Sequence, residues 1–335
     1  MKKLLDLFET YKKHIETYKI IIVANVRRHT GNFKSMVLNK ANPIEFFSDE
    51  EFDEICKAIL SLKIFTKIYY NELDFIEDVL KEKYDVKKII VINFARNGVV
   101  EGKKSLIPSF CDLLNIKYTT SNAFIQSLCR DKFVWSCVLQ QSGLPSLNSV
   151  YINENCEGLA KLSEYGKYIV KPKAESSSIN VSEPLAKQDV VSFAKNNQGK
   201  YIAQKFLCGN EIEVPFYELE GHYYMQEPAQ INYSGNILFE NLSEENNYYY
   251  SSCKFSGTEI LKIQETAKNA AKILGIKKYG RIDFKFDENG NAFIIDIATL
   301  PYLTENSSFA FSAKNQNFEY VSIFKILLTI AYLSN

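Results

Sequence analysis

Residues 279–301 read YGRIDFKFDENGNAFIIDIATLP, and this stretch decides the fold. Two runs that alternate apolar and polar residues flank a turn at 288–290, so they predict an antiparallel hairpin. Asp283 and Asp296 then point to the same end of the hairpin, and Arg281 shares the face of Asp283. Paired carboxylates of this kind bind hard cations such as Mg²⁺ beside phosphate oxygens. A purely structural role would need a compensating ion pair, because an unpaired buried carboxylate is costly.

Upstream of the hairpin, the segment YIAQKFLCGNEIEV places Glu211 and Glu213 after a predicted strand and a short linker. Two interpretations are equally open for these carboxylates. They form either the polar edge of a hairpin, or a site where backbone groups meet a nucleotide base and a carboxylate meets ribose hydroxyls. The whole block 211–239 alternates apolar and polar residues, as antiparallel strands do.

Further upstream, the segment IVKPKAESSS carries Lys171 from a strand into a loop of small residues. Backbone N–H groups of such a loop cradle phosphates in many proteins. Taken alone, a lysine at a strand end is more often a solvated charge. A second lysine, Lys132, follows Asp131 at the start of a predicted helix that ends in SGLPS.

The N-terminal part alternates helix and strand patterns. An amphipathic helix within 1–18 is predicted as an addition outside the core, and a helix after Ser48 has Glu51 three residues on, which is a capping box. The predicted strands are 18–24, 63–70 and 87–94. Alternation of this kind favours a parallel sheet with helices on both faces. Near the other end, 241–252 is interpreted as a polar, aromatic loop and 318–333 as a closing helix.

The composition is that of an ordinary globular protein. Of 335 residues, 46% are hydrophobic, 24% charged and 13% aromatic, which excludes a disordered, collagen-like or coiled-coil chain. Forty basic residues balance forty acidic ones, so net charge favours neither nucleic acid nor a membrane surface as a partner. Seven scattered cysteines form no CxxC pair, and every apolar run is far shorter than the ~20 residues that span a bilayer. We therefore expect a cytoplasmic protein without a disulfide framework or structural zinc.

Along the chain these patterns occur in the order Lys132, Lys171, Glu211 and the hairpin of Asp283. Together, in that order, they resemble the ATP-grasp ligases, and most of all the D-alanine:D-alanine ligase type. The resemblance runs from residue 121 to the C-terminus, with a weaker similarity in NGVVEGKKSLIPSFCDLLNIKYTTSN at 97–122. It implies an α/β (α+β) fold with three domains, 1–120, 121–206 and 207–335. The first carries a parallel sheet, and the other two are small α+β units that hold ATP between them. It also implies an ATP- and Mg²⁺-dependent enzyme that joins a carboxylate to an amine through an acylphosphate.

The resemblance assigns roles to individual residues. Those that correspond to nucleotide contacts are Lys132, Lys171, Ser176, Ser177, Ser178, Lys205, Leu207 and Glu211. Asp283 and Asp296 correspond to two of three usual metal ligands. The catalytic residues it implies are Lys171, Arg281, which steadies the acylphosphate, and Ser307, which binds the carboxylate of the incoming amino acid. Such a set suits phosphoryl transfer, which depends on positioning and charge neutralisation rather than on a protein nucleophile.

Two stretches depart from the family pattern around the predicted site. Where the family reads Glu-x-Asn-x-x-Pro-Gly, residues 296–302 read DIATLPY. Ala298 therefore replaces a metal-binding amide, and Tyr302 replaces a glycine near the reacting carbonyl. The serine loop lacks the usual glycines, and Gln204 stands where an acid is common.

The third departure lies near the N-terminus. The family's glycine-rich segment, with the glutamate that pairs with the ammonium of the first amino acid, is absent, and NVRRHTGNFKS follows the first strand instead. Arg27, Arg28 and His29 form either a solvated loop or an anion site for an acidic carboxyl donor. On an extended segment the two arginines would point to opposite sides, so only one would reach the site.

These patterns predict a carboxylate–amine ligase whose substrates differ from two D-alanines. Its expected partners are small amino-acid or carboxylate molecules, without nucleic acid or membrane, and both a peptide acceptor and a homodimer stay open. The aromatic residues 248–250 would suit a ligase that extends a larger acceptor. Two alternatives come from other classes: a nucleotide-binding pseudo-enzyme or regulatory module with a degraded metal site, and a structural protein without a nucleotide site.

Overall fold

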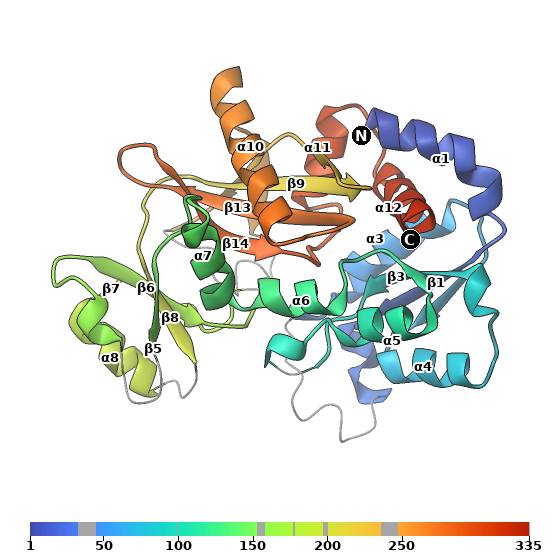
Figure 1. The fold of residues 1–335 in the computed structure, drawn as a ribbon, viewed down its shortest axis with the longest axis horizontal. Coiled ribbons are helices and arrows are strands. Elements are labelled where there is room, and N and C mark those ends of the chain that lie inside the picture. Colours follow the sequence, from blue (N-terminus) through green and yellow to red (C-terminus); the bar gives the residue numbers. More distant parts are fainter. Residues whose placement is uncertain are drawn as a thin grey trace.

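The computed structural model describes residues 1–32, 45–98, 100–152, 158–176, 178–196, 200–235 and 247–334. Within these ranges the strands form three sheets, each covered by helices (Figure 1). The N-terminal sheet and the sheet that contains β8 lie at opposite ends of the molecule, with β13 and β14 between and above them (Figure 1).

The N-terminal part is an α/β unit. Its helices and strands are α1 (Lys2–Ile15), β1 (Lys19–Ala24), α3 (Asp49–Leu60), β2 (Thr66–Tyr69), α4 (Glu72–Leu80), β3 (Ile89–Phe94), α5 (Leu106–Leu114) and β4 (Lys117–Tyr118). Short 3₁₀ turns are η1 (Arg27–Asn32), η3 (Val86–Lys88) and η4 (Val100–Gly102). The strands are parallel in the order β2-β1-β3-β4. The capping box of α3 is confirmed, because the Oγ of Ser48 accepts from the backbone N–H of Glu51 and the Glu51 carboxylate accepts from that of Ser48.

The remaining chain forms two antiparallel sheets. The first sheet has the strand order β5-β8-β6-β7. The elements of this part of the chain are α6 (Ala123–Arg130), α7 (Lys132–Gln141), β5 (Ser149–Ile152), η5 (Leu159–Lys161), β6 (Lys167–Pro172), β7 (Leu185–Ala186), α8 (Lys187–Asn196) and β8 (Tyr201–Lys205). The second sheet has the strand order β12-β11-β9-β13-β14, with β10 paired to β9. The elements of this part of the chain are β9 (Glu211–Leu219), β10 (His222–Met225), β11 (Ala229–Tyr233), β12 (Tyr248–Ser252), α10 (Gly257–Ile273), β13 (Tyr279–Phe286), β14 (Ala292–Ala298), α11 (Ser308–Asn315) and α12 (Val321–Leu333).

Both faces of the N-terminal sheet are covered, as its continuous apolar strands predict. Ile20 and Ile22 of β1 pack in one cluster with residues of α1, α3 and α12. Ile21 and Val23, which point the other way, pack with residues of α4 and α5. The predicted parallel sheet with helices on both faces is therefore confirmed.

Helix α12 returns from the C-terminal end of the chain to the N-terminal sheet. It lies beside α1 and near α3 in Figure 1, and its Leu327 shares one apolar cluster with Leu4 and Phe8 of α1. The interpretation of the first helix as an addition outside the core is wrong, because Leu4, Phe8 and Ile15 are at most 1% exposed. The predicted domain boundaries stay a prediction.

One face of the β9-β13-β14 sheet is apolar and the other is charged, because side chains alternate along each strand. Ile282 and Phe284 of β13 pack with residues of α6, α7 and α10. Arg281, Asp283 and Lys285 of the same strand line a cavity on the opposite face. The alternating pattern thus directs the charged residues of the predicted hairpin to one place.

Helices α4, α6 and α11 and strands β7 and β12 were not anticipated from the sequence. Helices α4, α6 and α11 have short periodic patterns, and the predicted loop over 241–252 contains strand β12, which pairs antiparallel with β11. Residues 241–246 lie outside the described residues. In the part of the chain that the structure describes, each helix is too short or too polar to span a bilayer.

We expect the packing of α12 to stabilise the N-terminal unit. Leu327 is fully buried, so replacing it with Ala leaves a cavity and should lower the free energy of unfolding by about 2 to 5 kcal/mol. Leu113 of α5 is 79% exposed, and Leu113→Ala should change that free energy by less than about 0.5 kcal/mol. Urea denaturation followed by circular dichroism compares the two variants. Equal effects would contradict the role given to α12.

Candidate active site

A cavity of about 270 Å³ is lined by residues from all three parts of the chain. One wall comes from β6 and β8, and the facing wall comes from β9, β13 and β14. Arg96, just after β3, and Lys104, after η4, line the cavity from the N-terminal unit. The cavity therefore lies at the junction that the three-part architecture creates.

Arg281 is the centre of a buried ionic cluster on the β13 wall. Its Nε and Nη2 donate to the two carboxylate oxygens of Asp283, each at 2.7 Å, and its Nη1 lies 3.1 Å from Oε2 of Glu213. The hydroxyl of Tyr250 donates to the same Glu213 oxygen at 2.9 Å. Burial alone disfavours the guanidinium charge, but the two carboxylates hold the pKa of Arg281 well above its ordinary value. Asp283 therefore has the compensating ion pair that a purely structural role would require.

Glu211, at the start of β9, also has partners on its own sheet. Its Oε2 accepts from the hydroxyl of Tyr233 at 2.8 Å and lies 3.3 Å from Nζ of Lys285. The carboxylate lines the cavity, as its predicted contact with a ribose requires. Leu207, in the linker before it, is buried and lines the same cavity.

Two lysines face Asp296 from the other side of the cavity, Lys132 at the start of α7 and Lys171 on β6. Nζ of Lys132 donates to the backbone carbonyl of Glu175 and lies 3.8 Å from Oδ1 of Asp296. Nζ of Lys171 donates to the backbone carbonyl of Ile295 at 3.1 Å, and burial lowers the pKa of Lys171 to about 8 although Asp296 opposes this shift. Burial would raise the pKa of Asp296, but Lys132 and Lys171 outweigh it and hold that pKa below the ordinary value.

The serine loop and Lys205 also line the cavity. The Oγ of Ser176 accepts from Lys104 and from Arg130, both at 3.1 Å, and Ser178 lies nearby on the lining. Ser177 lies outside the described residues. Lys205, at the end of β8, has a side chain 60% exposed with its Nζ 3.8 Å from Glu288. The loop is thus held by Lys104 of the N-terminal unit and by Arg130 of α6.

Ser307 begins helix α11 on the side of the cavity near Tyr248. Its Oγ accepts from the backbone N–H of Ala310 at 3.2 Å and donates to the carbonyl of Thr304 at 2.6 Å. Ser307 lines the cavity and is buried, so the cap holds its hydroxyl in place at the lining.

Magnesium fits this donor set at Asp296, and Asp283 as a second ligand stays a prediction. Asp283 and Asp296 are direct cross-strand partners, but both oxygens of Asp283 already accept from Arg281. The side chain of Asp296 is 38% exposed, and Ala298 offers no oxygen. Among the described residues, three His, Cys, Asp or Glu side chains nowhere gather around a common point that could hold a metal. Mg²⁺ is commonly bound by one or two carboxylates with phosphate oxygens and waters, and Asp296 meets that requirement.

The structure does not bring Arg27, Arg28 and His29 to the cavity. They lie in the 3₁₀ turn η1, so the expected extended segment is wrong. Arg28 lies 3.1 Å from Asp53 and 3.5 Å from Asp49, and the His29 ring stacks on Tyr70. The interpretation as an anion site for a substrate is therefore not supported at this position.

Sequence reasoning missed the cations that reach the cavity from the N-terminal unit. Lys104 lies in the stretch NGVVEGKKS, which had only the weaker family similarity, and Arg96 directly precedes it. Arg130 was not predicted as a site residue, because it lies just before Asp131 and Lys132, where the resemblance begins to assign roles. The signal that was available is the position of Arg96 just after β3, since the carboxyl ends of parallel strands often carry functional residues.

Solved structures share this architecture over almost the whole chain. The D-alanine–D-alanine ligase of Bacillus anthracis in complex with ATP aligns with a TM-score of 0.69 and 16% sequence identity, covering 94% of this chain and 97% of that one. A second structure of the same enzyme gives a TM-score of 0.67 at 17% identity. At these identities the comparison establishes the fold, so the predicted ATP-grasp architecture is confirmed.

Sequence comparison adds the family. Residues 140–329, more than half of the chain, match the model described as D-ala D-ala ligase C-terminus, so the chain belongs to that family. The D-alanine–D-alanine ligase of Thermotoga petrophila is 27% identical over 271 residues, which cover 79% of this chain and 87% of the relative. That of Acinetobacter baumannii is 27% identical over 237 residues, covering 67% and 75%. The predicted class, an ATP-dependent ligase of the ATP-grasp type, is confirmed at the level of the family.

Removal of Arg281 should cost more stability than removal of a surface cation. Arg281→Met leaves Asp283 and Glu213 buried without a counter-charge, and we expect the free energy of unfolding to fall by about 3 to 5 kcal/mol. The matched control is Lys81→Met, which breaks an exposed pair with Glu77 and should cost less than about 1 kcal/mol. Chemical denaturation measures both. A loss below about 1 kcal/mol for Arg281→Met would show that the two carboxylates do not depend on it.

Proposed function

We propose that this protein is an ATP-dependent carboxylate–amine ligase that forms an amide or peptide bond through an acylphosphate. The observation that carries the proposal is the meeting of Lys132, Lys171, Arg281 and Asp296 on one cavity in a chain of this ligase family. Lysines from α7 and β6 and an arginine from β13 would surround a polyphosphate and the group that receives its γ-phosphoryl.

In this proposal the nucleotide lies between the two antiparallel sheets. Its phosphates would contact Lys132, Lys171 and the serine loop, and its base and ribose would contact Lys205, Leu207 and Glu211. The support is that each of these named residues lines the cavity. Magnesium bound at Asp296 would neutralise phosphate charge and fix the orientation of the γ-phosphoryl group.

The chemistry would take two steps. The carboxylate of one substrate attacks the γ-phosphorus of ATP, so that ADP leaves and a mixed acylphosphate forms. The amine of the second substrate then attacks the acyl carbon, which releases inorganic phosphate and a proton. Arg281 is held by two carboxylates with its donors already oriented, so it would stabilise the charge on the reacting oxygens with little reorganisation. Ser307 would bind the carboxylate of the incoming amine substrate.

The substrates would differ from the two D-alanines that the relatives' names indicate. Tyr302 lines the cavity where the family pattern has glycine, so the space near the reacting carbonyl has another shape. A larger acceptor stays a second proposal within the same class. Tyr248 and Tyr250 on β12 line the cavity, which would place aromatic surface beside an extended acceptor. The pseudo-enzyme alternative is not favoured, because the cationic residues of the family pattern are retained.

Binding of Mg-ATP should stabilise the native protein. A ligand present at a hundredfold its Kd adds about 2.7 kcal/mol to the free energy of unfolding, because it binds only the native state. We expect a higher Tm with Mg-ATP in the parent, a much smaller shift in Asp296→Asn, and the parent shift in Lys81→Met. Coupled assay of ADP release against a panel of acids and amines then tests turnover. Stabilisation without amine-dependent ADP release would favour the pseudo-enzyme.

The affinity for ATP should fall as pH rises through 8. Lys171 in the free protein has its pKa lowered to about 8 by burial, so its amine is protonated below this pH and neutral above it. If only the charged amine binds phosphate, the affinity should decrease by about tenfold between pH 7 and pH 9. Lys171→Arg keeps its charge and should remove most of this dependence. Equal pH profiles in the parent and in this variant would contradict the assignment.

A further inference from the structure

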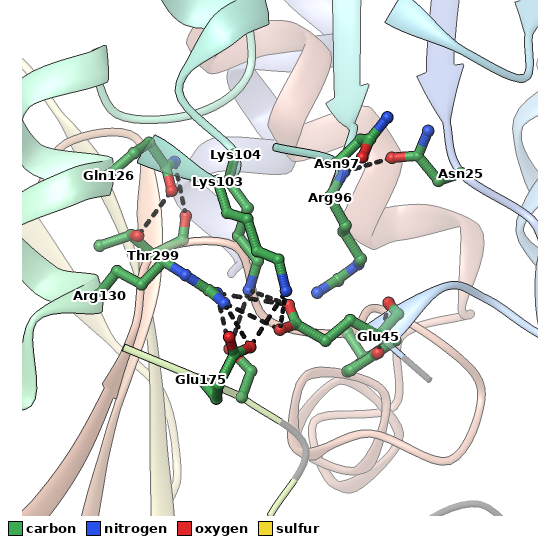
Figure 2. Close-up of polar contacts among 12 residues, drawn as sticks. Asn25, Glu45, Arg96, Asn97, Lys103, Lys104, Gln126, Arg130, Glu175 and Thr299 are labelled. Carbon is green, nitrogen blue, oxygen red and sulfur yellow. Dashed lines mark hydrogen bonds and ion pairs between the residues drawn. The ribbon is translucent and has the colours of Figure 1, made fainter. Parts of the chain in front are cut away.

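A buried cationic cluster closes the N-terminal end of the cavity, and its charges do not balance. In the described part of the chain it holds four cations and two carboxylates: Arg96, Lys103, Lys104, Arg130, Glu45 and Glu175. In Figure 2 dashed lines join the charged ends of Lys103, Lys104 and Arg130 to the two carboxylates, whereas none joins the guanidinium of Arg96 to them. An uncompensated buried charge is costly, so a surplus of cations needs an explanation.

The two carboxylates are used by Lys103 and Arg130. Nζ of Lys103 lies 3.0 Å from both Glu45 and Glu175. Nη2 of Arg130 lies 2.9 Å from Glu45 and 3.1 Å from Glu175. These four side chains form a closed ionic network, in which each cation bridges both acids (Figure 2).

Arg96 stands outside this network. It is 1% exposed, and its Nε and Nη2 have no hydrogen-bond partner among the described residues. Its guanidinium lies over the ring of Tyr302, 3.9 Å from the centroid, and 4.9 Å from the centroid of Phe47. The Tyr302 hydroxyl donates to the backbone carbonyl of Glu45 at 2.8 Å, which fixes the ring. A guanidinium held in this way is preorganised and lines the cavity. Its Nε and Nη2 can donate hydrogen bonds to a ligand.

Lys104 is the second cation with spare capacity. Its Nζ donates to Oγ of Ser176 at 3.1 Å and lies 3.5 Å from Glu45, which Lys103 and Arg130 share. Burial lowers the pKa of Lys104 well below its ordinary value, Glu45 opposes the shift, and Arg130, Arg96 and Lys103 add to it. An anion bound beside Lys104 would relieve this repulsion. Lys104 also lines the cavity.

We propose that Arg96 and Lys104 bind a second anionic group on the substrate that donates the carboxylate. The group is an oxyanion, either a carboxylate or a phosphate, and it lies beyond the carboxylate that is activated. The proposal rests on the ligase function proposed above and names the class of acid that the ligase takes: a diacid or a phosphorylated acid rather than a simple amino acid with a free ammonium.

The position of Arg96 favours the acid rather than the nucleotide, whereas Lys104, which donates to Ser176, also borders the serine loop. Arg96 follows β3, whereas Lys205 and Leu207 follow β8, and Figure 1 shows β3 and β8 at opposite ends with β14 between them. Tyr302, which carries Arg96 on its ring, follows β14 and the metal-site residue Asp296. The oxyanion site therefore lies beyond the proposed reacting centre from the nucleotide. It also replaces Arg27 and Arg28 as the means of holding an acidic donor.

The test is a comparison of matched probes in the full chain, with Mg²⁺ and a non-hydrolysable ATP analogue present. Succinate carries a second carboxylate, butyrate has the same carbon count without one, and 3-phosphonopropionate ends in a phosphonate. Ligand-observed NMR titration gives each affinity without turnover. We expect both dianions to bind at least about tenfold more tightly than butyrate, since hydrogen bonds to charged groups contribute this much. The order of the two dianions identifies the preferred oxyanion. Equal binding of all three probes, or binding of none, overturns the proposal.

The variants locate the effect. Arg96→Gln should reduce the preference for succinate over butyrate to about twofold or less, with the Kd of the ATP analogue unchanged. Should Arg96→Gln fail to fold, Lys104→Met should reduce the same preference, but its nucleotide affinity is not compared because Lys104 also donates to Ser176 of the serine loop. Arg28→Gln is the matched control, because Arg28 is an exposed arginine outside the cavity, and it should keep the parent preference. An unchanged preference in the cavity variants, or an equal loss of nucleotide affinity in Arg96→Gln, overturns the proposal.

Turnover separates this proposal from the ligase function. If ADP release is found and butyrate serves as well as succinate, the oxyanion site is wrong and the ligase stands. If no acid and amine together release ADP, yet the dianions bind through Arg96, the site stands and the ligase is wrong.

Discussion

Most charges that line the cavity are largely withdrawn from water and need a counter-charge, and this constraint governs the site. On the wall formed by β9 and β13 the protein supplies both signs itself. Arg281 joins Asp283 and Glu213, while Lys285 joins Glu211. Such closed pairs hold their geometry without a ligand, because breaking any one of them leaves a buried charge alone. The wall can therefore orient donors before a substrate arrives, which is what stabilisation of a developing charge requires.

Elsewhere in the cavity some positive charges are not fully compensated by the protein's own carboxylates. These cations indicate the charge that a ligand would supply. Lys171 is buried beside Asp296 with a lowered pKa, so its charge is incompletely compensated. Arg96 lacks partners for two of its nitrogens among the described residues, and Lys104 shares an acid that two other cations already use. Negative charge is therefore lacking at two places, beside Lys171 and beside Arg96 and Lys104. A polyphosphate at one end and an acidic substrate at the other would supply it.

The sequence predicted most of the architecture and the sheet wall of the site. Alternation along β13 and β14 was enough to bring Arg281, Asp283 and Asp296 to one face, because side-chain direction in a strand follows from residue parity. It could not predict the cationic cluster, since Glu45, Arg96 and Glu175 are far apart in the chain and meet only through tertiary packing. Tertiary packing also explains why the predicted anion site beside β1 is not supported. Arg28 lies near Asp49 and Asp53, which belong to the first turns of α3.

The departure at Tyr302 and the position of Arg96 are physically linked. The tyrosine ring supports the guanidinium, and its hydroxyl holds the backbone of Glu45, whose carboxylate in turn neutralises Lys103 and Arg130. A glycine at this position would offer neither the ring nor the hydroxyl, so Arg96 would lose its support and the network would lose one constraint. The residue that narrows the cavity for a small substrate is thus the residue that prepares it for an anionic one.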